Sequence, residues 1–263
     1  MTSSRRPPRE SQVSAALEPS QTRRSAPQGS QGRIRLWASI TSLSPLSVRD
    51  DALRLENAGV DGLHLDIADA HFAPFLTFGP RLACVLRKEL RIPIEVHLMT
   101  DDPESYIRQL ADCGIERLAF HVESTRHPWR VASLGRNLGF EMGAALNPVT
   151  AVSVAGALGS AVDYVNLLST DHDFAGDHLL AATANRVVHA RKEVPTGVRI
   201  QVDGAVDASN IGSLVAVGAD DLVVGRAICE QVDWTAAVAD LRRHCEDTIP
   251  EPEESESRRS PSG

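Results

Sequence analysis

Two patterns of hydrophobic and polar positions alternate along residues 33–246. Short runs rich in Val, Ile and Leu are typical of buried parallel strands, and each is followed by an amphipathic stretch typical of a surface helix. The short runs predict strands at Ile34–Ile40, Gly62–Ile67, Ile94–Met99, Arg117–His121, Glu141–Leu146, Tyr164–Leu168, Arg199–Val202 and Asp221–Val224. The amphipathic stretches predict helices at Pro45–Ala58, Gly79–Leu90, Pro103–Cys113, Pro128–Leu138, Ala151–Leu158, Asp177–Glu193, Ser209–Val217 and Trp234–Glu246.

Several joins between a helix and the next strand share one pattern, a glycine followed by an acidic residue two positions later. It occurs at residues 58–61, 113–116 and 217–220. Glycine adopts the left-handed conformation that ends a helix, and the acid opens the next turn. Eight strand–helix units predict a parallel sheet, and eight strands are the number that closes a (β/α)8 TIM barrel. We therefore expect one barrel domain at 33–246, with functional groups at the C-terminal ends of its strands.

The two ends of the chain lack hydrophobic periodicity. Residues 1–32 are rich in Ser, Arg, Pro, Gln and Gly, and residues 247–263 in Glu, Ser, Pro and Arg, which predicts two disordered tails. The first tail has no apolar core of a secretory signal, and we interpret it as a dispensable extension of a cytoplasmic protein. Its Arg- and Ser-rich, acid-poor character leaves an organelle transit peptide as the second interpretation.

Composition narrows the classes of partner. The formal net charge of -8 disfavours a broad surface for nucleic acid or an anionic membrane. No apolar run approaches the roughly 20 residues that a membrane-spanning helix needs. The four cysteines (Cys84, Cys113, Cys229 and Cys245) form no C-x-x-C pair, and we interpret them as free, buried residues of a reducing compartment. A small-molecule partner is expected, and association into a homo-oligomer stays open.

Candidate chemistry lies at or near the ends of three predicted strands. His64 and Asp66 are two residues apart in one strand, so both point to the same face. His97 lies in the next strand, and Asp203 directly follows the seventh. A lone buried histidine is usually a core residue, but four ligand-type side chains at one barrel rim predict a metal site. Imidazole and carboxylate ligands suit a divalent ion such as Zn, Mn, Fe or Co, without ranking these metals.

Asp66 and Asp203 also suggest proton transfer. With an acid on each side of a substrate, one carboxylate can remove a proton from one face and the other can return a proton to the opposite face. A carbon next to a ketone is acidic enough for this step, and a metal acting as a Lewis acid would stabilise the enediolate. The expected product is an epimer.

With these residues in place, the chain resembles the ribulose-phosphate 3-epimerase family. The matching segments occur in order through residues 34–230: Ala38-Ser39-Ile40, His64-Leu65-Asp66-Ile67-Ala68-Asp69-Ala70-His71-Phe72, Leu76-Thr77-Phe78-Gly79-Pro80, His97-Leu98-Met99, Asn147-Pro148 and Val202-Asp203-Gly204-Ala205-Val206. The resemblance implies a barrel of the ribulose-phosphate-binding type. It also implies one metal ion held by His64, Asp66, His97 and Asp203.

The resemblance assigns further roles. It implies Asp66 as the base and Asp203 as the acid in one direction, with the roles exchanged in reverse. Ser39 matches a serine that contacts substrate, His97 would touch both metal and substrate, and Met99 matches a methionine that caps the enediolate.

Departures from the family pattern fall mainly around the phosphate site. The loop that would grip phosphate after the sixth strand contains Asp173, Phe174, Ala175 and Gly176 in place of a glycine-rich sequence. Glycines let backbone N–H groups approach a phosphate, whereas acids in this loop would repel a dianion. Two later phosphate-binding pairs are Gly204-Ala205 and Gly225-Arg226. Arg226 would either bind the phosphate through a charged, bidentate contact or face solvent.

The leading hypothesis is a metal-dependent 3-epimerase with ribulose 5-phosphate and xylulose 5-phosphate as the default pair. A different ketose, such as a hexulose phosphate or an unphosphorylated or modified sugar, is the second hypothesis. A barrel that binds sugar or metal without turnover is the third. Related barrels decarboxylate acids with an Asp-x-Lys-x-x-Asp cluster, but Ile67-Ala68 after Asp66 supplies no lysine, so decarboxylation is disfavoured.

Overall fold

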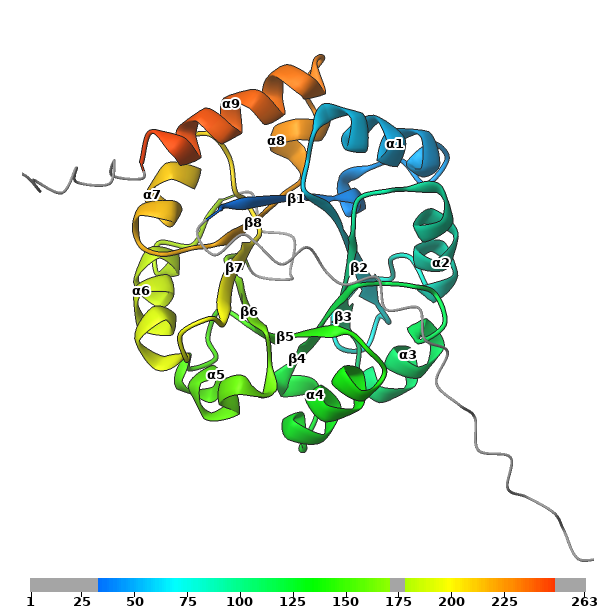
Figure 1. Cartoon of the computed structure of the whole chain (residues 1–263), viewed down its shortest axis with the longest axis vertical. Coiled ribbons are helices and arrows are strands. Elements are labelled where there is room, and N and C mark those ends of the chain that lie inside the picture. Colours follow the sequence, from blue (N-terminus) through cyan, green and yellow to red (C-terminus); the bar gives the residue numbers. More distant parts are fainter. Residues whose placement is uncertain (1–32, 171–177, 249–263) are drawn as a thin grey trace, which may run out of the picture. The chain divides into compact units, whose positions relative to one another are not determined.

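Eight parallel strands form a closed barrel in the computed structural model, which describes residues 33–170 and 178–248 (Figure 1). Each strand pairs with the next along the chain, and β8 pairs with β1 to close the sheet. The predicted TIM barrel is therefore confirmed. The strands are β1 (Arg35–Ser39), β2 (Gly62–Ala68), β3 (Ile94–Met99), β4 (Arg117–His121), β5 (Glu141–Leu146), β6 (Tyr164–Leu168), β7 (Arg199–Asp203) and β8 (Asp221–Val224).

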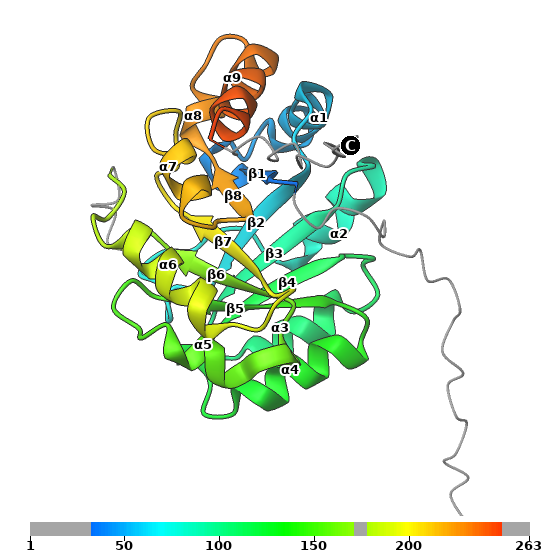
Figure 2. The same cartoon turned by 60° about the vertical axis from the view of Figure 1, so that its left-hand side comes forward.

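Helices surround the sheet and cover its outer face (Figures 1 and 2). Their apolar sides pack on the outward-facing strand residues, so most of the hydrophobic core lies between sheet and helices. The helices are α1 (Val48–Ala58), α2 (Pro80–Glu89), α3 (Pro103–Leu110), α4 (Pro128–Asn137), α5 (Ser153–Leu158), α6 (Thr183–Glu193), α7 (Ile211–Ala216), α8 (Arg226–Cys229) and α9 (Trp234–Glu246). Short 3-10 turns lie at Ile40–Ser42 (η1), Val122–Ser124 (η2) and Gly159–Ala161 (η3).

The main boundary errors concern helix starts. Helix α6 begins at Thr183, and the described residues before it are not helical, so the predicted start at Asp177 was wrong for residues 178–182. The backbone N–H of Leu180 instead donates to the carbonyl of Ser169, which holds this stretch against the end of β6. Helix α8 was not predicted, because one helical turn is too short to show a 3.6-residue period.

The interior of the barrel carries a buried arginine instead of a purely aliphatic layer. Arg117 on β4 lies between the rings of Trp37 on β1 and Tyr164 on β6, with its guanidinium carbon 4.4 and 3.8 Å from the two ring centroids. These strands are not neighbours in the sheet, so the three side chains meet inside the barrel. Two glycines make room for the rings. A Cβ built on Gly62 would lie 2.3 Å from the Trp37 ring, and one on Gly143 would lie 2.3 Å from the Tyr164 ring.

Two of the four cysteines are not free. Cys84 in α2 and Cys113 after α3 form a disulfide with a Cα–Cα distance of 4.7 Å. The sequence interpretation of four free cysteines was therefore wrong for this pair, because two helices that follow successive strands lie side by side and bring distant positions together. Cys229 and Cys245 are free, as expected.

No helix in the described part of the chain is long and apolar enough to cross a bilayer. The predicted tail at residues 1–32, all but the first two residues of the predicted tail at 247–263, and the predicted phosphate loop at residues 171–177 lie outside the described residues. What the sequence predicts for them stays a prediction. Asp247 and Thr248 form a turn at the end of α9, where the backbone N–H of Asp247 donates to the carbonyl of Arg243.

Candidate active site

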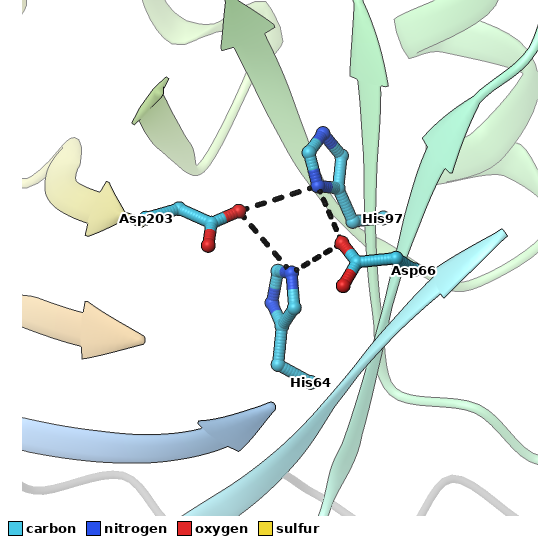
Figure 3. A group of neighbouring side chains, drawn as sticks. All are labelled: His64, Asp66, His97 and Asp203. Carbon is cyan, nitrogen blue, oxygen red and sulfur yellow. Dashed lines mark hydrogen bonds and ion pairs between the residues drawn. The ribbon is translucent and has the colours of Figure 1, made fainter. Parts of the chain in front are cut away.

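Two histidines and two aspartates meet at the C-terminal end of the barrel (Figure 3). Strand β2 supplies His64 and Asp66 on one face, and strand pairing places His97 of β3 directly beside Asp66. Asp203, the last residue of β7, reaches the same point from the other side. One ligand atom of each residue lies within 4.8 Å of the others. The sequence prediction that these four side chains converge is confirmed.

Each carboxylate contacts both rings. Asp66 Oδ1 lies 3.1 Å from His64 Nε2 and 3.1 Å from His97 Nδ1. Asp203 Oδ2 lies 3.3 Å from each of the same two nitrogens. The donor atoms thus alternate around one small space, with a carboxylate on either side and a ring above and below in the view of Figure 3.

Charge is concentrated in this buried space. Burial alone would raise the pKa of Asp66, but His64 and His97 outweigh it and hold that pKa well below its usual range. The same two rings lower the pKa of Asp203 against its burial. In turn, Asp203 and Asp66 overcome the burial of His64 and raise its pKa well above the usual value. The rings and the carboxylates thus favour opposite charges on each other, and a divalent cation at this point would supply the positive charge that two carboxylates favour.

The ring nitrogens that point away from the cluster also have partners, a glutamate for His64 and a histidine–glutamate pair for His97. The far nitrogen of His64, Nδ1, donates to Glu95 at 3.2 Å. The far nitrogen of His97, Nε2, lies 3.0 Å from Nε2 of His121, and Nδ1 of His121 lies 3.2 Å from Glu123. Sequence reasoning missed these residues. The available signal was spacing, because Glu95 lies two positions before His97 in one strand and Glu123 lies two positions after His121.

The two carboxylates also have polar neighbours that the sequence did not reveal. Thr41 in the turn η1 donates to Asp66, and Asn166 on β6 donates to Asp203 Oδ2 at 3.2 Å. Asn166 is fully buried in the sixth strand. A buried amide in an otherwise apolar strand was a detectable signal, whereas Thr41 lies in a turn without periodicity.

A cavity of about 340 Å³ opens beside Asp203. It gathers the predicted substrate-contacting residues from the ends of β1, β7 and β8: Ser39, Gly204, Ala205, Gly225 and Arg226. Arg226 is exposed at the start of α8. Two acids that the sequence analysis did not single out, Asp207 and Glu230, line the same cavity.

Met99 was expected close to the reacting atoms. It is buried at the end of β3 in a small cluster with Ala68 and Ala73, and it is not among the residues that line the cavity beside Asp203. Asp173, Phe174, Ala175 and Gly176 lie outside the described residues.

Asp69 has a structural use. Its carboxylate accepts hydrogen bonds from the backbone N–H groups of His71, Phe72 and Asp101, which fixes the loop after β2. It is therefore committed to holding that loop.

Two alanines near the site have left-handed backbone. Ala70 in the loop after β2 has φ 60°, and Ala205 after β7 has φ 51°. Residues with a Cβ rarely adopt this conformation, which costs roughly 1–2 kcal/mol relative to glycine. The loop after β2 and the loop after β7 are thus each strained at one residue.

Comparisons with known proteins identify a family. Residues 35–229 match the model of the ribulose-phosphate 3 epimerase family. The chain is 34% identical over 207 residues to ribulose-phosphate 3-epimerase 1 of Cupriavidus necator, covering 76% of this chain and 86% of that one. It is 31% identical over 208 residues to the ribulose-phosphate 3-epimerase of Escherichia coli strain K12, covering 78% and 92%.

Solved structures share the fold at much lower identity. KGPDC from Streptococcus mutans superposes with a TM-score of 0.63 at 15% identity, covering 83% of this chain and 100% of that one. Orotidine 5'-phosphate decarboxylase from Pyrococcus horikoshii OT3 gives a TM-score of 0.60 at 14% identity, covering 80% and 99%. At such identities the likeness concerns the barrel alone. The family match, by contrast, spans every strand of that barrel, and the chain therefore belongs to the ribulose-phosphate 3 epimerase family, whose named members are carbohydrate epimerases and hence isomerases.

Proposed function

We propose that the chain is a metal-dependent epimerase that inverts C3 of a ketose phosphate, with ribulose 5-phosphate and xylulose 5-phosphate as the pair. The arrangement of Asp66 and Asp203 carries this proposal, because both carboxylates contact the same two rings from opposite sides (Figure 3). Two acids that flank one point can serve the two faces of a substrate carbon bound between them.

The donor set fits one divalent ion. Two imidazole nitrogens and two carboxylate oxygens converge in a buried space, which is a ligand set suited to Zn, Mn, Fe or Co. We propose His64, Asp66, His97 and Asp203 as its ligands. When bound, the ion would supply Lewis-acid stabilisation of negative charge on the substrate oxygens.

The two aspartates would move the protons. Asp66 takes the proton from C3, the electrons of the broken C–H bond form the C2–C3 double bond, and the π electrons of the C2 carbonyl move onto its oxygen to give an enediolate. Asp203, which enters the cycle protonated, then donates its proton to the opposite face of C3. The C2–C3 double-bond electrons form the new C–H bond, and the electron pair on the C2 oxygen re-forms the carbonyl. In the reverse direction the two residues exchange roles.

The cavity beside Asp203 would hold the rest of the substrate. Ser39, Gly204 and Gly225 line this cavity, and the two glycines expose backbone there. Arg226 would supply a positive charge for the phosphate. We propose Met99 as a cap over the intermediate, and Ala205 and the segment Asp173–Gly176 as further phosphate contacts.

One observation favours a second candidate, an epimerase of a different ketose. Asp207 and Glu230 line the same cavity as Arg226, and carboxylates near a phosphate raise the free energy of binding a dianion. A ketose with no phosphate, or with a modified end, would not meet this repulsion.

A substrate screen separates the two candidates. Chelator-stripped protein is reloaded with one divalent ion at a time and incubated with ribulose 5-phosphate, ribulose and a hexulose phosphate in heavy water. We expect deuterium at C3 and formation of xylulose 5-phosphate from the first compound only. Turnover of another ketose without turnover of ribulose 5-phosphate would replace the default substrate. Absence of C3 exchange with every ketose would indicate a barrel that binds without catalysis.

A further inference from the structure

The carboxylate of Glu95 links His64 to the barrel interior. Glu95 lies on β3, two residues before His97, and is fully buried. Its Oε1 accepts a hydrogen bond of 3.2 Å from Nδ1 of His64. Its Oε2 accepts one of 3.0 Å from the amide of Gln201 and lies 3.3 Å from a guanidinium nitrogen of Arg117. Each oxygen of this carboxylate therefore faces only donors.

Arg117 cannot easily turn away from Glu95. Its guanidinium is stacked between Trp37 and Tyr164 and lies 3.0 Å from Asp221. The guanidinium nitrogens make no hydrogen bond of good geometry within the described part of the chain, so charge and the two rings hold this side chain. A fixed cation beside Oε2 requires an acceptor atom at that position.

We propose that Glu95 is a positioning residue of the metal centre, which holds the His64 ring with its proton on Nδ1 and its Nε2 lone pair directed at the other three ligands. The inference rests on the metal site of the proposed function. Only one ring nitrogen of a neutral imidazole carries a proton, and the partner of the far nitrogen decides which one. Arg117 contributes indirectly: it holds one oxygen of the Glu95 carboxylate, so the other oxygen faces the His64 ring.

The variant Glu95→Gln gives a specific expectation. The fixed Arg117 and the Gln201 amide are both donors, so they select the amide oxygen of the substituted side chain. The NH2 group of that side chain then faces Nδ1 of His64 as a donor. Nδ1 must accept that bond, which moves the ring proton to Nε2, the nitrogen that should bind the metal. The variant is nearly isosteric, so this change in ring protonation occurs without a cavity.

Glu141 offers a matched control. It lies 3.2 Å from Arg117 and is not a partner of the His64 ring, so Glu141→Gln also removes one acid from Arg117 without changing the contacts of that ring. Glu141 is more exposed than Glu95, with 32% of its side chain accessible. Far-UV circular dichroism and thermal unfolding check that both variants remain folded. Glu95→Asp restores the acceptor and should recover part of the zinc affinity.

The test measures zinc binding to the full-length chain after removal of metal, by calorimetric titration with Zn²⁺. We expect one ion per wild-type chain, about 10- to 100-fold weaker binding in Glu95→Gln, and binding close to wild type in Glu141→Gln. Imidazole ¹⁵N shifts of metal-free protein at a pH where His64 is neutral, assigned with a His64→Asn variant, should show the proton on Nδ1 in wild type and on Nε2 in Glu95→Gln.

Four results would overturn the inference. Unchanged zinc affinity in Glu95→Gln would mean that Glu95 does not orient the ring. An equal loss of zinc affinity in Glu141→Gln would mean that the effect comes from the removed charge near Arg117. If the ring proton of His64 stays on Nδ1 in Glu95→Gln, then Glu95 does not determine the protonated nitrogen. If the wild-type chain binds no Zn²⁺, Mn²⁺ or Co²⁺, the metal site of the proposed function fails and the role of Glu95 fails with it.

Discussion

The hydroxyl of Thr41 donates a hydrogen bond of 2.7 Å to Oδ2 of Asp66, while Oδ1 of the same carboxylate contacts His64 and His97. The two oxygens of the proposed base therefore have different partners: Oδ1 contacts the two histidine rings, and Oδ2 accepts the hydrogen bond from the turn η1. A hydroxyl bonded to this oxygen fixes the plane of the carboxylate, and hence the direction from which it can take a proton.

Thr41→Val should lower the turnover number by roughly 10- to 100-fold, since a hydrogen bond to a charged group contributes about 1.5–3 kcal/mol. The shape of the side chain is kept, so KM should change little. Steady-state kinetics in both directions check this, with Thr41→Ser as the control that retains the hydroxyl. A Val variant as fast as wild type would show that Asp66 needs no such support.

Asp203→Asn should reduce epimerisation by about 10³-fold or more, because the second face of the substrate loses its proton donor. Exchange of the C3 proton through Asp66 should persist for one epimer only, which nuclear magnetic resonance in heavy water resolves. Metal content must be measured alongside, since Asp203 is also a proposed ligand. Equal exchange for both epimers in a metal-loaded variant would contradict the two-acid mechanism.

Ala205→Gly should raise the free energy of unfolding by about 0.5–1 kcal/mol, because glycine removes the strain of the left-handed conformation at φ 51°. Ala70→Gly should do the same at φ 60°. Urea unfolding measures both changes. Ala239→Gly in the middle of α9 is the control and should destabilise by about 1 kcal/mol, since its backbone is helical. Destabilisation at all three positions would mean that no strain is stored in the loops.

Glu123 should make stability depend on pH. Its burial opposes ionisation, but hydrogen bonds from His121, Thr150 and the backbone of Asn147 lower its pKa from 4.5 to about 2. A pKa lowered by folding adds stability above the unfolded value, and that stability is lost as pH falls from about 4.5 toward 2. Taken in full, this shift corresponds to about 3 kcal/mol at pH 7, and solvent screening of the partly exposed side chain reduces the contribution to about 1–2 kcal/mol.

The variant Glu123→Gln tests the sign. Its deficit in unfolding free energy relative to wild type should be largest at pH 7 and should shrink by about 1 kcal/mol at pH 4. Glu246→Gln, at the exposed end of α9, reports the general effect of removing one negative charge. If the loss of unfolding free energy in Glu123→Gln instead grows as the pH falls, folding does not lower the pKa of Glu123.

Local pattern was sufficient to predict the sheet and the clustering of His64, Asp66, His97 and Asp203. The spacing of His64 and Asp66 gives their common face, and the order of strands in a parallel barrel gives the position of His97 beside them. Asp203 followed from the end of its strand. Each of these inferences needs only the order and spacing of residues along the strands, and none needs to know which side chains meet across the barrel interior.

What the sequence did not reveal depends on contacts across the barrel or outside regular structure. Glu95 and Arg117 are charged residues in mainly apolar strands. No local sequence pattern predicts that they pair inside the barrel. Thr41 reaches Asp66 from a turn. The start of α6 at Thr183 is set by a bond between Leu180 and Ser169, which overrides the local helical preference.

The disulfide between Cys84 and Cys113 encloses the whole of β3, including Glu95 and His97, in one covalent ring of chain. A protease that cuts once between the two cysteines would therefore leave the two pieces joined. Electrophoresis without reductant would show a chain of unchanged size, and two fragments would separate only after reduction.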